Sequence, residues 1–120
     1  MYSNIYAMVT GGAQPDPLDS LVLELRRGAI VLAVLSRLDQ EEYGYSLKRS
    51  LAEAGLDIDE GTLYPLLRRL EGQGLLGSQW LLAEGRPRRY YKISARGLKT
   101  RRELADEWNA LAQVMKGLLP

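Results

Sequence analysis

Apolar residues recur every three or four positions over most of the chain, which is the period of helices that bury one face. Three segments in the first two thirds show this pattern: residues 18–38, 43–54 and 62–73. Gly55 follows the second segment, where a glycine favours a helix end. The first segment is also apolar on its other faces, so we expect it to be buried on two sides, one of them against a partner chain.

Pro65 restricts where the third helix begins. Inside a helix, a proline removes one hydrogen bond and clashes with the carbonyl group four residues earlier. With Thr62 as the N-cap, Pro65 falls in the first turn, where its missing donor costs little. A start at Asp59 instead requires a kinked first turn, so the pattern favours a helix from Thr62 to Gln73.

After that helix the period changes to that of strands. Residues 75–82 and 88–94 are rich in residues that favour strands, and the loop 83–87 between them contains glycine and proline. This pattern predicts a β-hairpin with a basic tip. Alternation along the second strand predicts that Tyr91 and Ile93 pack inward.

A last helix is predicted from Ala95 to about Leu118, with Ser94 as its N-cap. Its apolar residues alternate steps of four and three, which is the spacing of a coiled-coil seam. One small domain cannot bury this seam alone, and an exposed stripe of this kind promotes aggregation. We therefore expect a homodimer built by the last and first helices. The expected interface residues are Leu21, Leu25, Leu104, Trp108, Leu111 and Met115, with Leu118 at the end of the seam.

The element order is helix, helix, helix, hairpin, helix. It predicts a fold that is mainly α with a small β-hairpin: a winged helix-turn-helix followed by a C-terminal dimerisation helix. We divide the chain into an N-terminal extension (1–17), a winged helix-turn-helix domain (18–94) and the dimerisation helix (95–120). Glycine and proline interrupt the extension, and it lacks the charge and apolar pattern of a secretory signal.

Composition excludes several classes of protein. The 120 residues fit one domain, and 46% apolar with 26% charged residues is the balance of a soluble globular protein. The chain has no cysteine and no histidine, which excludes zinc–thiolate sites and a Ser-His-Asp triad. No apolar run approaches the roughly 20 residues of a membrane helix. We expect a cytoplasmic protein with no catalytic residues, metal or cofactor.

The net charge of +1 conceals an uneven distribution. Residues 1–60 carry 5 basic and 10 acidic side chains, residues 61–102 carry 10 and 2, and residues 103–120 carry 1 and 3. The three segments therefore have charges of −5, +8 and −2. A basic block inside a nearly neutral chain indicates a polyanion-binding face, whereas the alternative is a solvated surface with scattered cations.

The third predicted helix has four leucines on one side and polar groups on the other. Its hydroxyls, phenol and two guanidinium groups are those that contact phosphates and base edges in a DNA major groove. Arg68 is suited to a bidentate contact with guanine, and the helix dipole favours phosphate near the N-terminus. The candidate DNA-contacting residues are Gly61, Thr62, Tyr64, Arg68 and Arg69. The alternative is an amphipathic helix with two solvated arginines.

The hairpin segment RPRRYYK, residues 86–92, has four cations in seven residues and two tyrosines. Cations at this density suit contact with the DNA backbone or minor groove. Arg86 and Arg88 are the candidate contact residues. The alternative is a charged edge strand that resists aggregation.

Trp108 has two interpretations. It packs in the core or the dimer seam, or it is an aromatic platform that stacks a planar ligand in a cavity between two protomers.

Four segments together resemble the PadR family of bacterial transcriptional regulators: LRRGAIVLAVLSRL, YGYSLKRSL, DEGTLYPLLRRLEGQGLL and GRPRRYYKISARG. The resemblance extends from Leu18 to Trp108. It implies a winged helix-turn-helix, a dimerising C-terminal helix, a recognition helix over 61–70 and a wing tip over 86–88. It also implies a repressor, since most members of the family repress genes and many release DNA on binding a small effector.

The short C-terminal part resembles the short-tailed subgroup of that family. In some of its members, a tryptophan on the last helix lines a pore at the dimer interface that accepts flat aromatic compounds. Trp108 lies at a similar place, which implies an aromatic small-molecule effector. The expected partners are therefore a palindromic double-stranded DNA operator, a second copy of the chain and such an effector. The competing hypotheses are a winged-helix module that binds protein and, with no residue set to support it, an enzyme.

Overall fold

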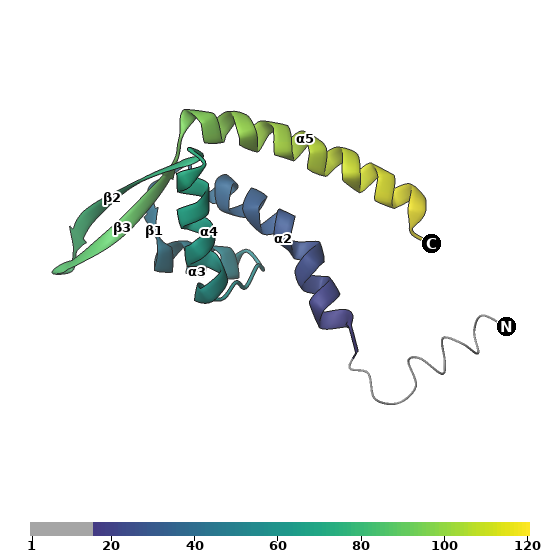
Figure 1. The fold of residues 1–120 in the computed structure, drawn as a ribbon, viewed down its shortest axis with the longest axis horizontal. Helices are drawn as coiled ribbons and strands as arrows, with labels where there is room; N and C mark the ends of the chain where they lie inside the picture. The colour runs from purple at the N-terminus through teal and green to yellow at the C-terminus, as the bar shows by residue number, and fades with distance from the viewer. Residues whose placement is uncertain (1–15) are drawn as a thin grey trace.

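The computed structural model describes residues 16–120 (Figure 1). Of the predicted N-terminal extension, residues 1–15 lie outside the described residues. The elements are α2 (Leu18–Arg37), β1 (Glu42–Tyr43), α3 (Gly44–Glu53), α4 (Glu60–Gly72), β2 (Leu76–Ala83), β3 (Arg86–Ile93) and α5 (Ala95–Leu118).

The predicted start of α4 at Thr62 is wrong, because the helix begins at Glu60 with Asp59 as its N-cap. The Asp59 carbonyl accepts the backbone N–H groups of Thr62 and Leu63 at 3.1 and 3.0 Å. The Thr62 hydroxyl donates to Asp59 Oδ1 at 2.8 Å. Pro65 therefore lies inside the helix. The carbonyl that it leaves without a donor belongs to Gly61, a residue exposed to solvent, so the missing hydrogen bond costs less than it would in the core.

The predicted five-residue hairpin loop is also wrong. The turn consists of Glu84 and Gly85 alone, with φ angles of 54° and 76°. Two successive positive φ angles make a type I′ turn, whose twist matches that of the strands it joins. Because the turn is so short, Arg86 belongs to strand β3, where it pairs with Ala83.

The sheet has a third strand that the sequence pattern did not predict. β1 pairs with β3, with Glu42 opposite Tyr91 and Tyr43 opposite Tyr90, and the strand order is β1-β3-β2. Two residues are too few to show alternation, so the predicted second helix wrongly included Tyr43. The β2–β3 hairpin extends away from the helices as a wing (Figure 1).

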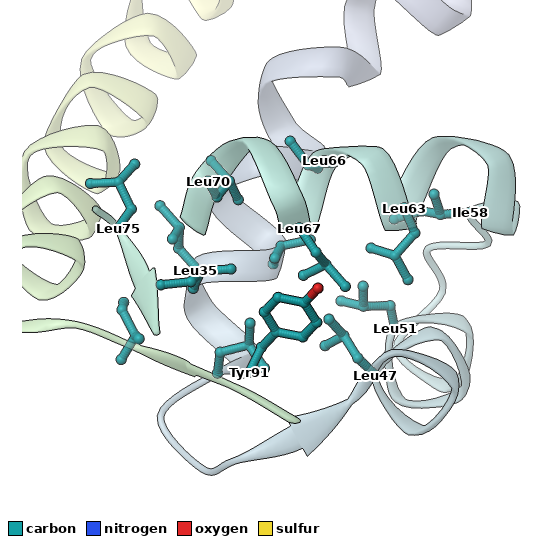
Figure 2. Packing of buried hydrophobic residues seen from close by; sticks show 14 residues of the cluster. Leu35, Leu47, Leu51, Ile58, Leu63, Leu66, Leu67, Leu70, Leu75 and Tyr91 are labelled. Atoms are coloured by element: carbon teal, nitrogen blue, oxygen red, sulfur yellow. The ribbon is translucent and has the colours of Figure 1, made fainter. Parts of the chain in front are cut away.

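The core lies between α2, α3, α4 and the base of the sheet. Leucines on one side of α4 pack against α2, α3 and Tyr91 (Figure 2). Tyr91 and Ile93 are 6% and 8% exposed, which confirms that they pack inward. Each buried leucine stabilises the fold by about 1.5–3 kcal/mol. The members are Val34, Leu35, Leu38, Leu47, Leu51, Ile58, Leu63, Leu66, Leu67, Leu70, Leu75, Leu76, Tyr91 and Ile93.

The start of α5 is held tightly against the core. The predicted cap is confirmed, because Ser94 Oγ accepts the backbone N–H of Gly97 at 3.0 Å. A Cβ atom on Gly97 would lie 2.1 Å from the Leu75 carbonyl oxygen, so only glycine permits this approach. Arg101 Nη1 contacts Asp39 Oδ1 at 2.7 Å and joins α5 to the end of α2. These contacts set the direction in which α5 leaves the core.

The first half of α2 and the second half of α5 extend beyond the core and diverge (Figure 1). The molecule measures 65 × 33 × 26 Å, and these two segments carry much of its exposed apolar surface. Within residues 16–120, no helix is long and apolar enough to cross a membrane. The predicted architecture is confirmed: a mainly helical winged helix with a small antiparallel sheet.

Candidate nucleic-acid interface

The leucine side of α4 is buried, so the opposite side is exposed and divides into two flanks. Tyr64 and Arg68 face the wing, whereas Thr62 and Arg69 face α2. Gly61 is exposed in the first turn between them. The structure therefore brings the five predicted residues to the solvent-facing surface of one helix, but on two flanks of that surface.

A cavity of about 410 Å³ lies between α4, the start of α3 and the wing. We call it the wing-side cavity. Its lining combines aromatic rings with guanidinium groups and contains no carboxylate. The lining residues are Tyr43, Gly44, Tyr45, Tyr64, Arg68, Trp80, Pro87, Arg88, Arg89 and Tyr91.

Arg89 anchors the wing to α4. Its Nη2 lies 2.7 Å from Glu71 Oε1, and its Nε donates to Ser78 Oγ at 3.0 Å. The Ser78 hydroxyl in turn donates to Glu71 Oε2. These contacts close a network between the end of α4 and both strands of the wing. Such a network orients the wing relative to α4.

Arg88 is half-buried rather than a free cation at the wing tip. Its guanidinium carbon lies 4.4 Å from the centroid of the Tyr43 ring, within the range of a cation–π contact. Arg88 Nε is buried and has no hydrogen-bond partner within residues 16–120. Arg86, the other predicted wing residue, is exposed beside the turn. The two arginines thus have different surroundings, although they are only two residues apart.

Tyr64 is held by close packing against the start of α3. A Cβ atom on Gly44 would lie 2.6 Å from the Tyr64 ring, so the glycine makes room for it. Burial, and to a lesser extent the Glu60 carboxylate, raises the pKa of the Tyr64 phenol. Burial likewise raises the pKa of Tyr91, although Arg89 opposes this. Both phenols are therefore protonated at neutral pH and remain hydrogen-bond donors.

The other flank of α4 borders a smaller groove of about 250 Å³ against α2. Thr62 and Arg69 line it together with Arg27. Its floor is apolar, formed by Ile30, Val31, Pro65 and Leu66. This groove therefore combines apolar side chains with two arginines.

Trp108 lies outside the core and is 51% exposed. It lines a third cavity, of about 190 Å³, against the α2 residues Ala29, Leu32, Ala33 and Ser36. Of the predicted seam, Leu104 packs against the core, whereas the other members are exposed. Leu21 and Leu25 on α2 are exposed as well, at 53% and 80%.

Sequence reasoning missed Tyr43, Tyr45 and Trp80 as parts of the site. Tyr43 and Tyr45 enter it because β1 joins the sheet beside β3, which is a long-range pairing. The aromatic pair around Gly44 was a visible signal, since a glycine between two tyrosines at a helix start suggests close packing. Trp80 comes to the cavity because it is paired with Arg89 across the hairpin.

Comparison with known proteins identifies close relatives. The model of the transcriptional regulator PadR-like family matches residues 31–104. Transcriptional regulator Rv3488 of Mycobacterium tuberculosis is 36% identical over 97 residues, which cover 80% of this chain and 88% of that protein. The matched family is one of transcriptional regulators.

Solved structures agree in fold. The crystal structure of a PadR family transcriptional regulator from Eggerthella lenta is similar with a TM-score of 0.79 and 48% identity, covering 85% of this chain and 91% of that one. A transcriptional regulator from Clostridium thermocellum is similar with a TM-score of 0.76 and 28% identity, covering 81% of this chain and 99% of that one.

Removing the Glu71 carboxylate should destabilise the protein. We expect Glu71→Ala to lower the free energy of unfolding by about 1–3 kcal/mol, because Arg89 and Ser78 lose their shared acceptor. The matched control is Glu84→Ala, whose carboxylate is 89% exposed and lies 3.9 Å from Arg88. The control should change stability by less than about 0.5 kcal/mol. Urea denaturation measures both, and equal effects would contradict the anchoring role of Glu71.

Proposed function

We propose that this chain, which belongs to the PadR-like family of transcriptional regulators, represses its target genes as a homodimer on a palindromic DNA operator. The observation that carries the proposal is the exposed side of α4 next to a basic wing. Residues 61–102, which include both, have a net charge of +8. Phosphate neutralisation by such a surface supplies most of the affinity for DNA.

In this proposal, α4 enters the major groove and the wing contacts the adjacent backbone or minor groove. Arg68 reads base edges, and Gly61, Thr62, Tyr64 and Arg69 contact the surrounding phosphates. Arg86 extends from the wing tip to the minor groove. Arg88, stacked on Tyr43, contributes charge from the inner side of the wing. Residues 18–94 are the DNA-binding unit.

Residues 95–120 form the dimerisation helix, which pairs with α2. The exposed halves of α2 and α5 support this proposal, because an isolated soluble monomer rarely leaves so much apolar surface in water. The rigid junction at Gly97 and Arg101 would carry the dimer geometry to α4. A repressor acts where the chromosome lies, so the proposal places the protein in the cytoplasm.

We also propose a planar aromatic effector that binds beside Trp108. The cavity between Trp108 and α2 supports it, because a second protomer on the same surface would enlarge and enclose it. A ligand there releases DNA only if it binds one dimer geometry more tightly than the other. The competing proposal, a module that binds protein, lacks a comparable reason for its basic α4 and wing.

Arg68→Ala and Arg86→Ala should weaken DNA binding in different ways. Loss of Arg68 should weaken the free energy of binding to the operator by about 1–3 kcal/mol and relax the sequence preference of the protein. Loss of Arg86 should weaken binding to all sequences alike and reduce the slope of affinity against salt by about one. Footprinting on the DNA upstream of the gene locates the operator, and anisotropy titrations at several salt concentrations compare it with a scrambled duplex.

The matched control for both variants is Arg102→Ala, an exposed arginine on α5, outside α4 and the wing. It removes the same charge and should leave specificity unchanged. If Arg68→Ala and Arg86→Ala bind like the parent protein, the assignment of this face is wrong. If affinity for DNA is negligible and does not depend on salt, the protein-binding module becomes the better proposal.

Sedimentation should show a dimer at micromolar protein concentration. Replacing Leu111 with Glu places a charge in the exposed row of α5 and should shift the protein to monomer, since burial of an unpaired charge is costly. Glu103→Gln, an exposed position off this row, serves as the control. A monomeric parent protein would refute the dimer.

In the complex of the dimer with DNA, the two α4 helices should lie about one DNA turn, roughly 34 Å, apart.

Planar dyes should quench the fluorescence of Trp108 saturably. Trp80→Phe removes the only other tryptophan signal, since the chain has two tryptophans. A saturable decrease with a dye that also lowers operator affinity supports the effector. No saturable quenching, or a dimer structure with both Trp108 rings packed and no cavity between them, excludes the effector but not the dimer.

A further inference from the structure

The wing-side cavity is larger than the two other cavities described above, and its lining has a distinctive chemistry. Five of its residues supply aromatic rings and three supply guanidinium groups. No lining residue carries a carboxylate. Rings favour a planar aromatic partner, and guanidinium groups favour an anion. The rings belong to Tyr43, Tyr45, Tyr64, Trp80 and Tyr91, and the cations to Arg68, Arg88 and Arg89.

Two of the three cations are available to a ligand. Arg89 is committed to Glu71 at 2.7 Å. Arg68 is exposed and has no ion pair within residues 16–120. Arg88 Nε is buried without an acceptor in that part of the chain, and its only ion pair there is a 3.9 Å contact with the exposed carboxylate of Glu84. An anion in the cavity would give the Arg88 guanidinium group a closer partner than Glu84.

The presence of two guanidinium groups in the lining of one cavity favours a phosphate. Arg68 is on α4 and Arg88 is on β3, so the two guanidinium groups come from different walls of the cavity. A phosphate monoester has three terminal oxygens and nearly two negative charges at neutral pH, and it can accept from both arginines at once. A carboxylate has only two oxygens and one charge. The stacking on Tyr43 holds the Arg88 guanidinium in place.

Trp80 supplies the surface for a ring. It is 63% exposed although it lines the cavity, and the Arg89 guanidinium carbon lies 5.7 Å from the centroid of its ring, so the exposed part of the indole is the surface on which a base would stack. Stacking on aromatic side chains is the usual way in which proteins hold nucleobases. The cavity volume of about 410 Å³ is within the usual range for small-molecule sites, about 300–1,000 Å³. We propose that the wing-side cavity binds a free nucleotide, with its phosphate between Arg68 and Arg88 and its base on Trp80.

Binding there would regulate the proposed repressor. Arg68 belongs both to this cavity and to the proposed DNA surface, so a bound nucleotide and the operator would compete for it. This regulatory part rests on the proposed function, whereas binding of the nucleotide itself does not. The site is separate from the cavity beside Trp108, which shares no lining residue with it.

Calorimetry with the full chain tests the site, using adenosine monophosphate as the probe. Adenosine has the ring without the phosphate, and inorganic phosphate has the anion without the ring. We expect each of them to bind at least about tenfold more weakly than the nucleotide, because each forms only one of the two contacts. Equal affinity for the nucleotide and adenosine, or no binding of the nucleotide, would overturn the proposal.

Single-residue variants test whether the nucleotide binds in this cavity. Arg68→Gln and Arg88→Gln should each weaken nucleotide binding about tenfold, and Trp80→Val should weaken it several-fold. Arg102→Gln removes the same charge from α5 and should bind like the parent protein. Thermal unfolding of each variant checks that it is folded. If the nucleotide binds equally well to Arg88→Gln and to the parent, the site is not this cavity.

The operator experiment separates this inference from the proposed function. Saturating nucleotide should raise the apparent Kd for the operator at constant ionic strength, and adenosine should not. A protein that binds no DNA would refute the proposed function, while calorimetry would still decide the nucleotide site. A protein that binds DNA but no nucleotide would show that Arg68 and Arg88 serve DNA alone, and the inference would be wrong.

Discussion

The fold depends on the burial of one side of α4. Its leucines are in contact with α2, α3 and the base of the sheet at the same time, so the helix is the centre of the core (Figure 2). Burial of apolar surface is the main favourable term in folding, and here it also decides which side of α4 meets the solvent. Tyr64, Arg68 and Arg69 are presented outward because the leucines between them face inward.

The wing depends on a polar interaction instead. Beyond Tyr91, the hairpin leaves the core and has few apolar contacts, so its orientation relative to α4 is set by the Glu71–Arg89–Ser78 network. The same network uses up one of the three arginines of the wing-side cavity. Within residues 16–120, Arg89 is closely paired with a carboxylate, whereas Arg68 and Arg88 are not, although all three lie in one basic stretch of the chain. Charge counted along the sequence does not distinguish them.

The exposed halves of α2 and α5 belong to a third kind of surface. They carry much of the exposed apolar surface and lie on the side of the molecule away from the wing, and α5 meets the core at a junction that only glycine at position 97 permits. The two cavities that lie nearest these surfaces and the wing have different chemistry. The cavity beside Trp108 is mainly apolar, and the wing-side cavity is aromatic and cationic. One small chain thus carries two surfaces of different chemistry, one aromatic and cationic and the other apolar.

The sequence by itself determined the features that depend on neighbours a few residues apart. Helical periods located α2 and α5 to within a residue or two, Ser94 identified the cap of α5, and strand alternation showed that Tyr91 and Ile93 are buried. These features follow from local geometry, since side chains repeat every 3.6 residues in a helix and every two in a strand. The motifs also sufficed to indicate the family.

Only the tertiary structure decided the features that depend on contacts between distant residues. The pairing of Tyr43 with Tyr90 created β1. The start of α4, by contrast, is a local feature that the sequence pattern misplaced, because the helix begins directly after Asp59 although Pro65 argued against it. Arg88 and Arg89 are adjacent in sequence, yet one stacks on Tyr43 and the other pairs with Glu71. A charged side chain interacts most strongly with the opposite charge that is nearest to it in space, and the spacing of residues along the chain does not give that distance.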